Sequence, residues 1–380
     1  MMSTEERKTI YLCLAHMSEE GFEQKYVKEA FDTNWVVPMG PNVNAFEQNL
    51  ADFANANLDG SKLDRKVVCL SAGTAAVHLA LIACGVKAGD EVCVQSFTFC
   101  ASSHPITYLG AKPVFIDSER ETWNMDPELL EKAIVERKAV TGKYPKAIIP
   151  VALYGMPYDC ERIMAIADKY GIPVIEDAAE GMGSRFNGQV LGTFGRFGVL
   201  SFNGNKMITT SGGGALICRN EEDANNIMWH ATQARDAYPY YQHTEIGYNY
   251  RMSNVCAGIG RGQMTVLDKH IAHHKHVQAL YKELLEEVKG IHLHEQPETM
   301  NPKTGERKFD SNFWLCAATL DEDVKIQGQE SAYKEVIKTA VGGAAGVIKA
   351  VDSAVTDCRS EEHTSELQSP MYIVWRLLLE

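Results

Sequence analysis

From about residue 66, short strands rich in Val and Ile alternate with helical segments. Strands are predicted at 66–70, 91–94, 113–116, 147–151 and 173–177. Helical patterns separate most of them, as at 74–84, 127–138 and 159–170. Uniformly apolar strands that are separated by helices form parallel sheets whose two faces are both covered. We therefore expect an α/β fold with a mostly parallel sheet covered by helices.

The composition excludes several classes of protein. The 380 residues are 45% hydrophobic and 23% charged, as is typical of a soluble globular protein. The formal net charge is −13, so the chain lacks the positive charge with which proteins bind nucleic acid. Residues 1–8 are not followed by a signal-like apolar segment, and no run reaches the roughly 18 apolar residues that span a bilayer. We expect neither a nucleic-acid partner nor a membrane partner.

Cysteines and histidines give no clear metal site. The ten cysteines are spread along the chain and none forms a C-x-x-C pair, which favours reduced thiols and a cytoplasmic protein. Four histidines, His270, His273, His274 and His276, have the helical spacing that suits a metal. Because no cysteine joins them and the surrounding sequence is polar, we predict a solvated helix face and no metal.

Three segments are predicted along the chain. Residues 1–250 hold an N-terminal arm and the α/β sheet, and residues 251–358 begin with long polar helices and continue into a smaller, truncated C-terminal domain. Residues 359–380 are predicted to be a non-native tail, because 359–369 resembles a translated sequencing adapter. The alternative is a polar linker before the apolar terminus at 371–375. Function is therefore read from residues 1–358.

An acid and an amine follow two apolar segments. Asp177 ends the strand 173–177, and Lys206 follows a small polar run that begins at Ser201 and precedes three glycines at 212–214. Parallel sheets bind ligands at the carboxyl ends of their strands. A pyridoxal phosphate (PLP) enzyme needs a lysine that forms a Schiff base and an acid that keeps the pyridine nitrogen protonated. The plainer interpretation is a surface lysine and a solvated strand end.

Further residues suit the same cofactor. Gly73 and Thr74 lie between a strand and a helix, where backbone N–H groups and a hydroxyl can hold a phosphate. Phe99 follows another strand and can stack on a ring, and Glu180 lies three residues after Asp177. Each has an ordinary alternative, namely a helix N-cap, a core side chain or an exposed charge. No G-x-G-x-x-G follows a strand, so the dinucleotide fingerprint is absent.

In this order, these residues resemble the DegT/DnrJ/StrS family of PLP-dependent sugar aminotransferases. The likeness covers about residues 11–314. Within the family it is greatest to enzymes that aminate carbon 4 of UDP-4-keto-6-deoxy-N-acetylglucosamine on the bacillosamine route. The segments that carry this likeness are 34–41 (NWVVPMGP), 46–47 (FE), 153–155 (LYG), 203–206 (NGNK) and 233–235 (QAR).

The resemblance implies fold type I of the PLP-dependent transferases and a role for each matching residue. Lys206 would form the Schiff base and shuttle protons, and Asp177 would pair with the pyridine nitrogen. Glu180 would contact the hydroxyl side of the ring, and Phe99 would stack on it. The phosphate ligands that the resemblance implies are Gly73, Thr74, Ser201 and, from the neighbouring subunit, Asn249. A homodimer with shared active sites follows from that last role. By itself, the segment 247–253 indicates only a loop and a helix cap.

The implied reaction has two halves. Glutamate gives its amine to the cofactor and leaves as 2-oxoglutarate, and the amine then passes to a nucleotide-linked 4-keto-6-deoxy sugar. Two features depart from the family: Phe313 stands where related sequences often have Arg, and family members normally continue well past residue 358. One alternative is a catalytically impaired, truncated chimaera that only binds PLP. Another is a dehydratase of the same family, in which His replaces the Schiff-base lysine, so Lys206 argues against it.

Overall fold

The computed structural model describes residues 16–302 and 304–321, which fall into two compact units. The larger unit comprises Cys13–Ala279 and Glu295–Leu315, and the smaller one includes Leu280–His294 and the residues from Cys316 onward. Residues 322–358 of the predicted C-terminal segment and the whole predicted tail at 359–380 lie outside the described residues. The proposed boundary between residues 250 and 251 stays a prediction.

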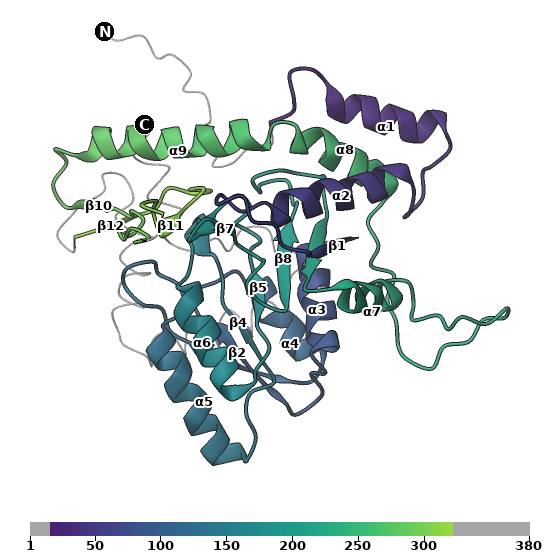
Figure 1. Ribbon diagram of the computed structural model, residues 1–380, viewed down its shortest axis with the longest axis horizontal. Helices are drawn as coiled ribbons and strands as arrows, with labels where there is room; N and C mark the ends of the chain where they lie inside the picture. Colours follow the sequence, from purple (N-terminus) through teal and green to yellow (C-terminus); the bar gives the residue numbers. More distant parts are fainter. Residues whose placement is uncertain (1–15, 303, 322–380) are drawn as a thin grey trace, which may run out of the picture. The chain divides into compact units, whose positions relative to one another are not determined.

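A mostly parallel sheet forms the centre of the larger unit (Figure 1). Its strands, in spatial order, are β3 (Lys112–Ile116), β2 (Glu91–Gln95), β4 (Ala147–Ile149), β5 (Ile175–Asp177), β8 (Phe197–Ser201), β9 (Gly214–Cys218) and β1 (Lys66–Leu70). The first three strands and the last four form two hydrogen-bonded groups. Two single parallel bridges, Ile148 to Val174 and Val151 to Asp177, join these groups between β4 and β5. β9 runs antiparallel to both of its neighbours, β8 and β1, and the other strands of this sheet share one direction. The predicted α/β class is therefore confirmed.

Helices cover both faces of this sheet. Figure 1 shows α3 (Gly73–Ala83), α4 (His104–Tyr108) and α7 (Glu221–Ala231) on one side, and α5 (Pro127–Thr141) and α6 (Cys160–Tyr170) on the other. In β1 the last four residues are buried, and in β9 all five are. Because successive side chains of a strand point to opposite faces, this uninterrupted burial requires cover on both sides.

Local signals set the ends of the covering helices. The carboxylate of Asp126 accepts hydrogen bonds from the N–H groups of Glu128 and Leu129 at the start of α5, and Gly142 ends that helix in the left-handed conformation. Asp159 and Gly171 do the same for α6. An acidic N-cap and a C-terminal glycine satisfy backbone groups that a helix leaves unpaired.

The remaining elements complete the two units. The larger unit also holds α1 (Phe22–Asp32), α2 (Pro41–Asn55), α8 (Asn254–Met264), two short 3₁₀ turns (Cys100–Ser102 and Leu153–Gly155) and a small sheet of β6 (Arg185–Phe186), β7 (Gln189–Val190) and β11 (Phe309–Asp310). Helix α9 (Leu267–Leu285) begins in the larger unit and ends in the smaller one. In the smaller unit, β10 (Ile291–Leu293) pairs antiparallel with β12 (Ala318–Leu320). Among the described residues, no helix is long and apolar enough to cross a membrane.

Two neighbouring acids of β5 serve opposite faces of the sheet. Glu176 is fully buried, and its carboxylate accepts three backbone hydrogen bonds, from Gly192 at 2.9 Å, Phe194 at 2.7 Å and Gly195 at 2.6 Å. Burial raises the pKa of Glu176, while these three N–H groups lower it. The side chain of the next residue, Asp177, points to the other face because strand side chains alternate. Glu176 is thus the acid that fixes a turn.

We expect Glu176→Gln to destabilise the fold. Glutamine offers one acceptor oxygen, so its amide nitrogen faces a backbone donor and at least one buried N–H loses its partner, at about 1–3 kcal/mol. The melting temperature of the protein, followed by circular dichroism, should fall by roughly 5 °C. Glu29→Gln, at an exposed glutamate of α1, is the control and should leave it unchanged. A Glu176→Gln protein that melts with the wild type would show that the three hydrogen bonds carry no net stability.

Candidate active site

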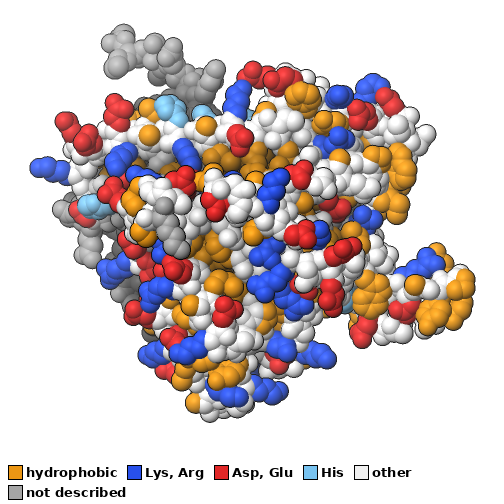
Figure 2. Space-filling model, viewed as in Figure 1, with side chains coloured by type: hydrophobic (Ala, Val, Ile, Leu, Met, Phe, Trp, Pro, Cys, Tyr) orange, Lys and Arg blue, Asp and Glu red, His pale blue; other side chains and the backbone are white. Residues whose placement is uncertain are grey.

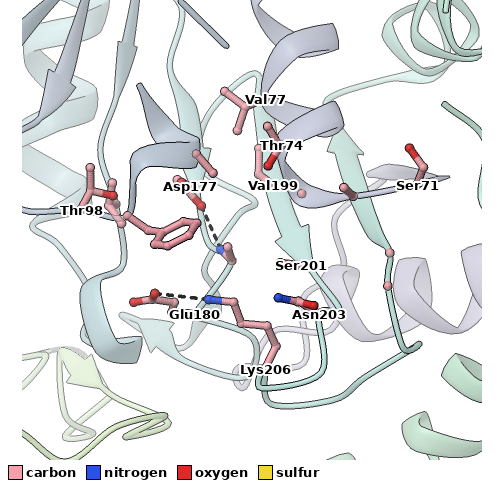
Figure 3. Close-up of a pocket in the computed structure, with 18 residues that line it drawn as sticks. Ser71, Thr74, Val77, Thr98, Asp177, Glu180, Val199, Ser201, Asn203 and Lys206 are labelled. Carbon is pink, nitrogen blue, oxygen red and sulfur yellow. Dashed lines mark hydrogen bonds and ion pairs between the residues drawn. The ribbon is translucent and has the colours of Figure 1, made fainter. Parts of the chain in front are cut away.

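A cavity of about 290 Å³ lies where the carboxyl ends of β5 and β8 meet the start of α3 (Figure 3). Because β9 runs in the opposite direction, its first residue reaches the same edge of the sheet. Side chains and backbone from these elements line the cavity. They are Ser71, Ala72, Gly73, Thr74, Val77, Thr98, Phe99, Ala101, Val151, Asp177, Ala179, Glu180, Val199, Ser201, Asn203, Lys206, Gly212 and Gly213. A volume of this size suits a small cofactor.

The start of α3 lies at one end of the cavity. Its N-cap residue, Ala72, makes no side-chain capping hydrogen bond, so the first N–H groups of the helix are not satisfied in that way. The hydroxyls of Thr74 and Ser201 line the same end. Gly214 lies directly behind it, since a Cβ atom there would come within 2.4 Å of the Gly73 nitrogen. Free backbone donors and the positive end of a helix dipole are what a phosphate requires.

Asp177 is an oriented, buried carboxylate in the same cavity. It is 7% exposed. The hydroxyl of Ser102 donates to its Oδ2 at 2.5 Å, and the N–H of Ala179 donates to its Oδ1 at 3.2 Å. Two donors on separate oxygens hold the carboxyl plane in one orientation.

Glu180 and Lys206 form an ion pair across the cavity (Figure 3). The Nζ of Lys206 lies 3.3 Å from Oε1 of Glu180, and their side chains are 12% and 9% exposed. The backbone N–H of Tyr154 donates to the other oxygen of Glu180 at 2.7 Å. Burial raises the pKa of Glu180, whereas the charge of Lys206 lowers it and that of Asp177 raises it. Glu180 therefore lies between the attraction of the amine and the repulsion of the second carboxylate.

The structure brings together all but one of the predicted site residues. Phe99 lines the cavity and is 68% exposed. The further predicted residues that line it are Gly73, Thr74, Asp177, Glu180, Ser201 and Lys206. Asn249 does not line this cavity; it is exposed and pairs through its backbone with Thr232.

Three residues that support the cavity were not predicted from the sequence. Ser102, which holds Asp177, and Tyr154, which holds Glu180 through its backbone, come from separate 3₁₀ turns. Trp314 stacks its ring on Lys206, with Nζ 4.1 Å from the ring centroid. Ser102 lies three residues after Phe99, and this closeness to a predicted site residue is the only sequence feature that points to Ser102. The contacts of Tyr154 and Trp314 join distant segments and leave no local pattern.

The predicted solvated histidine face is only half correct. His273 and His276 are exposed, but His270 lies 3.2 Å from the Met207 carbonyl and is partly buried. Burial and the neighbouring His273 lower the pKa of His274 to about 4. Over the described ranges, no three His, Cys, Asp or Glu side chains are arranged to hold a metal ion.

Comparison with known proteins identifies the family. The model of the DegT/DnrJ/EryC1/StrS aminotransferase family matches residues 17–343. The chain belongs to this family. Its cofactor is pyridoxal phosphate, and it is a sugar aminotransferase. The family predicted from the sequence is thereby confirmed.

Individual relatives agree with this assignment. The chain is 46% identical over 314 residues to the Bacillus subtilis protein named "Putative pyridoxal phosphate-dependent aminotransferase EpsN", covering 83% of this chain and 76% of the relative. It is 36% identical to a GDP-perosamine synthase of Escherichia coli O157:H7, covering 74% and 73%. It is 37% identical to a UDP-2-acetamido-2-deoxy-3-oxo-D-glucuronate aminotransferase of Pseudomonas aeruginosa, covering 66% and 65%.

A solved structure supports the fold of the aminotransferase. The crystal structure of a DegT DnrJ EryC1 StrS aminotransferase from Brucella abortus superposes with a TM-score of 0.71 at 27% sequence identity. The match covers 80% of this chain and 76% of that one. The donor set of the cavity also fits the cofactor, because it offers a lysine amine, buried carboxylates and an uncapped helix N-terminus.

We expect Ser102→Ala to weaken the binding of pyridoxal phosphate. The substitution removes one of the two donors to Asp177, and a hydrogen bond to a charged group contributes about 1.5–3 kcal/mol. The dissociation constant of the cofactor, measured by titrating cofactor-free enzyme, should rise about tenfold or more. Ser103→Ala is the matched control, because the Ser103 hydroxyl donates only to the Cys100 carbonyl among the described residues. Equal dissociation constants for the two variants would contradict a role for Ser102.

Proposed function

We propose that the enzyme transfers the amino group of glutamate to a nucleotide-linked 4-keto-6-deoxy sugar, with UDP as the nucleotide. The observation that carries this proposal is the ion pair of Lys206 and Glu180 in the cavity that Asp177 and the start of α3 also line. An amine, two acids and an anion site in one enclosed volume are the groups that the chemistry of this family requires.

Each residue of the cavity takes one role in this proposal. Asp177 holds a proton at the ring nitrogen of the cofactor, and Ser102 keeps the Asp177 carboxylate aimed at it. Phe99 packs on the ring face, which its exposed position in the cavity allows. Glu180 orients Lys206 and contacts the edge of the ring. The phosphate is bound by Gly73, Thr74 and Ser201.

The chemistry follows from these positions. When bound, pyridoxal phosphate supplies the electron sink that stabilises negative charge at a reacting carbon. Lys206 would hold the cofactor covalently in the resting enzyme. Once released, its Nζ would move the proton at the α-carbon of glutamate and, in the second half, at carbon 4 of the sugar. The low exposure of Lys206 and Glu180 keeps water away from these transfers.

The nucleotide is the least constrained part of the proposal. One relative is named for a GDP-linked product and another for a UDP-linked substrate, so relatives of this chain differ at this point. We choose UDP because the segments 34–41 and 203–206 resemble those of aminotransferases that act on a UDP-linked sugar.

A panel of substrates tests the proposed reaction. The full chain, loaded with pyridoxal phosphate, would be incubated with glutamate and with UDP-, GDP- and dTDP-linked 4-keto-6-deoxy sugars, and 2-oxoglutarate and amino sugar would be quantified. We expect turnover with the UDP-linked ketosugar and none with Lys206→Ala, because the variant lacks the amine that moves the protons. Cofactor binding without turnover on any sugar would indicate the catalytically impaired chimaera instead. Turnover by Lys206→Ala would refute the assignment of the lysine.

We also propose that two copies of the chain share their active sites. A loop between α7 and α8 projects from the larger unit, and apolar side chains gather on it (Figures 1 and 2). Its exposed large side chains are Tyr238, Tyr240, Tyr241 and Ile246. At the base of the loop, Gly247 crosses the backbone of Gln233 so closely that a Cβ atom would lie 2.0 Å from the Gln233 carbonyl carbon. An exposed, ordered aromatic surface of this kind supports contact with a second copy.

The segment after this loop directs Asn249 outward. Tyr248 and Tyr250 both pack against the buried His78 of α3, with ring centroids 4.9 Å and 6.0 Å away. Because side chains alternate along extended backbone, Asn249 between them faces the other way, and it is exposed. The N–H of Ser71 donates to the Tyr250 carbonyl at 2.8 Å, which connects this segment to the turn between β1 and α3. An outward Asn249 is well placed to reach the phosphate of a partner.

Subunit mixing tests this sharing. Asn249→Asp, which puts a negative charge beside the partner's phosphate, and Lys206→Ala should each be inactive alone. After the two proteins are unfolded and refolded together, about a quarter of wild-type activity should return, because half of the dimers carry one intact site. Activity that stays at the level of the parents would show that each chain forms its site alone.

The remaining proposal concerns location. We place the reaction in the cytoplasm, because all eight cysteines among the described residues are free thiols, four of them buried in strands or helices of the core. Reduced cysteines persist in the reducing compartments of the cell. The ketosugar nucleotide and glutamate would be supplied there.

A further inference from the structure

The amine of Lys206 is enclosed by two groups of different kinds. On one side lies the carboxylate of Glu180, at 3.3 Å. On the other lies the ring face of Trp314, whose centroid is 4.1 Å from Nζ. Trp314 is 3% exposed, so the contact is shielded from water. A carboxylate and an indole face both attract an ammonium ion, and the attraction of the ring grows when solvent is excluded.

The ring of Trp314 is held in this position by the lysine's own loop. Its Nε1–H donates to the carbonyl of Asn205 at 2.8 Å, and Asn205 directly precedes Lys206. Rotation of the indole away from Lys206 would break this buried hydrogen bond. The indole is therefore fastened to the backbone directly before the residue that carries the amine.

A single side chain connects the two groups that enclose the amine. The amide nitrogen of Asn312 donates to the carbonyl of Glu180 at 2.9 Å and to that of Met182 at 2.8 Å. The amide oxygen of Asn312 accepts from the N–H of Trp314 at 2.8 Å. Asn312 is fully buried, so it fixes the spacing between the carboxylate and the indole.

We infer that Trp314 is a positioning residue that holds the free ammonium form of Lys206 between its ring and Glu180. The inference rests on the proposed function, in which the lysine is released from the cofactor during one half of the cycle. A released lysine on a four-carbon stem would otherwise lose its orientation or leave the cavity. Held by the indole, it stays within reach of the carbon whose proton it moves and of the cofactor to which it returns.

Weakening the attraction of the indole for the ammonium ion in steps tests this role and keeps the shape of the side chain. Tryptophan with one, two or three fluorines would be placed at position 314 by codon suppression, since fluorine withdraws charge from the ring face and leaves the N–H in place. The full-length enzyme would be loaded with pyridoxamine phosphate, which leaves Lys206 without a cofactor bond. Acylation of Lys206 by an amine reagent at fixed pH would be followed by peptide mass spectrometry. We expect its rate to rise with each fluorine, to about threefold in all.

Side-chain replacements extend the series. Trp314→Leu removes the ring, and we expect Lys206 to be acylated about fivefold faster. Trp314→Phe keeps a ring but loses the hydrogen bond to Asn205, so its rate should lie between those of Leu and wild type. Lys169, whose Nζ lies 5.2 Å from the Tyr170 ring, is labelled in the same samples as the internal control and should not change. If the Leu variant does not fold, the fluorinated series alone decides.

A kinetic measurement separates positioning from a structural role. With excess 2-oxoglutarate, the return of the cofactor to Lys206 should slow about tenfold in Trp314→Leu, while its affinity for pyridoxamine phosphate changes less than about threefold. Equal acylation rates across the fluorinated series would overturn the inference. Borohydride reduction and peptide mapping of the wild type distinguish this from failure of the proposed function. Cofactor fixed elsewhere than on Lys206 would reject the proposed function, whereas cofactor on Lys206 with a flat series would reject only the role of Trp314.

Discussion

The site depends on the burial of an ammonium beside a carboxylate. Lys206 and Glu180 are 12% and 9% exposed, and either charge alone would cost several kcal/mol at such a position. Each is therefore tolerated because the other is present, and burial raises the pKa of Glu180 while Lys206 lowers it. The backbone N–H of Tyr154 occupies the second oxygen of Glu180, so the carboxylate cannot turn away from the amine. The pair is stable only in this geometry, and the geometry places the amine where Asp177 and the start of α3 converge.

The sheet supplies that convergence through strand direction and alternation. β5 and β8 run parallel, so Asp177 and Ser201 end at one edge, and the reversed β9 brings Gly214 back to the same edge behind the start of α3. Alternation along β5 then separates two acids that are adjacent in sequence. The carboxylate of Glu176 accepts hydrogen bonds from three backbone N–H groups of a turn, whereas Asp177 faces the cavity. The end of β5 thus provides one acid that holds a turn in place and one that faces the cavity.

These relations mark what a sequence can and cannot predict. The strand ending at Asp177, the turn at Gly73 and the caps at Asp159 and Asp126 are local patterns, and the structure contains them. The direction of β9 is not local, because it depends on the route of the chain from Ser201 to Gly214. Alternation predicts that Glu176 and Asp177 face opposite sides but not which side holds the cavity. The contacts of Ser102 with Asp177 and of Trp314 with Lys206 span 75 and 108 residues, so no local sequence pattern predicts them.

The backbone at Phe313 depends on the same kind of long-range contact. Phe313 lies between two buried residues, Asn312 and Trp314, and its φ of 48° is unfavourable for a bulky side chain. Such conformations cost about 1–3 kcal/mol and persist only where neighbouring contacts impose them. Here the amide of Asn312 bonds to Glu180 and Trp314, and the N–H of Phe313 bonds to the Ser311 hydroxyl at 3.0 Å. The backbone of this segment therefore organises the amine and its carboxylate, while the Phe313 side chain remains only half-buried. The hydrogen bonds that support Lys206 through Glu180 and Trp314 therefore come from Asn312 and the backbone, and none comes from the Phe313 side chain.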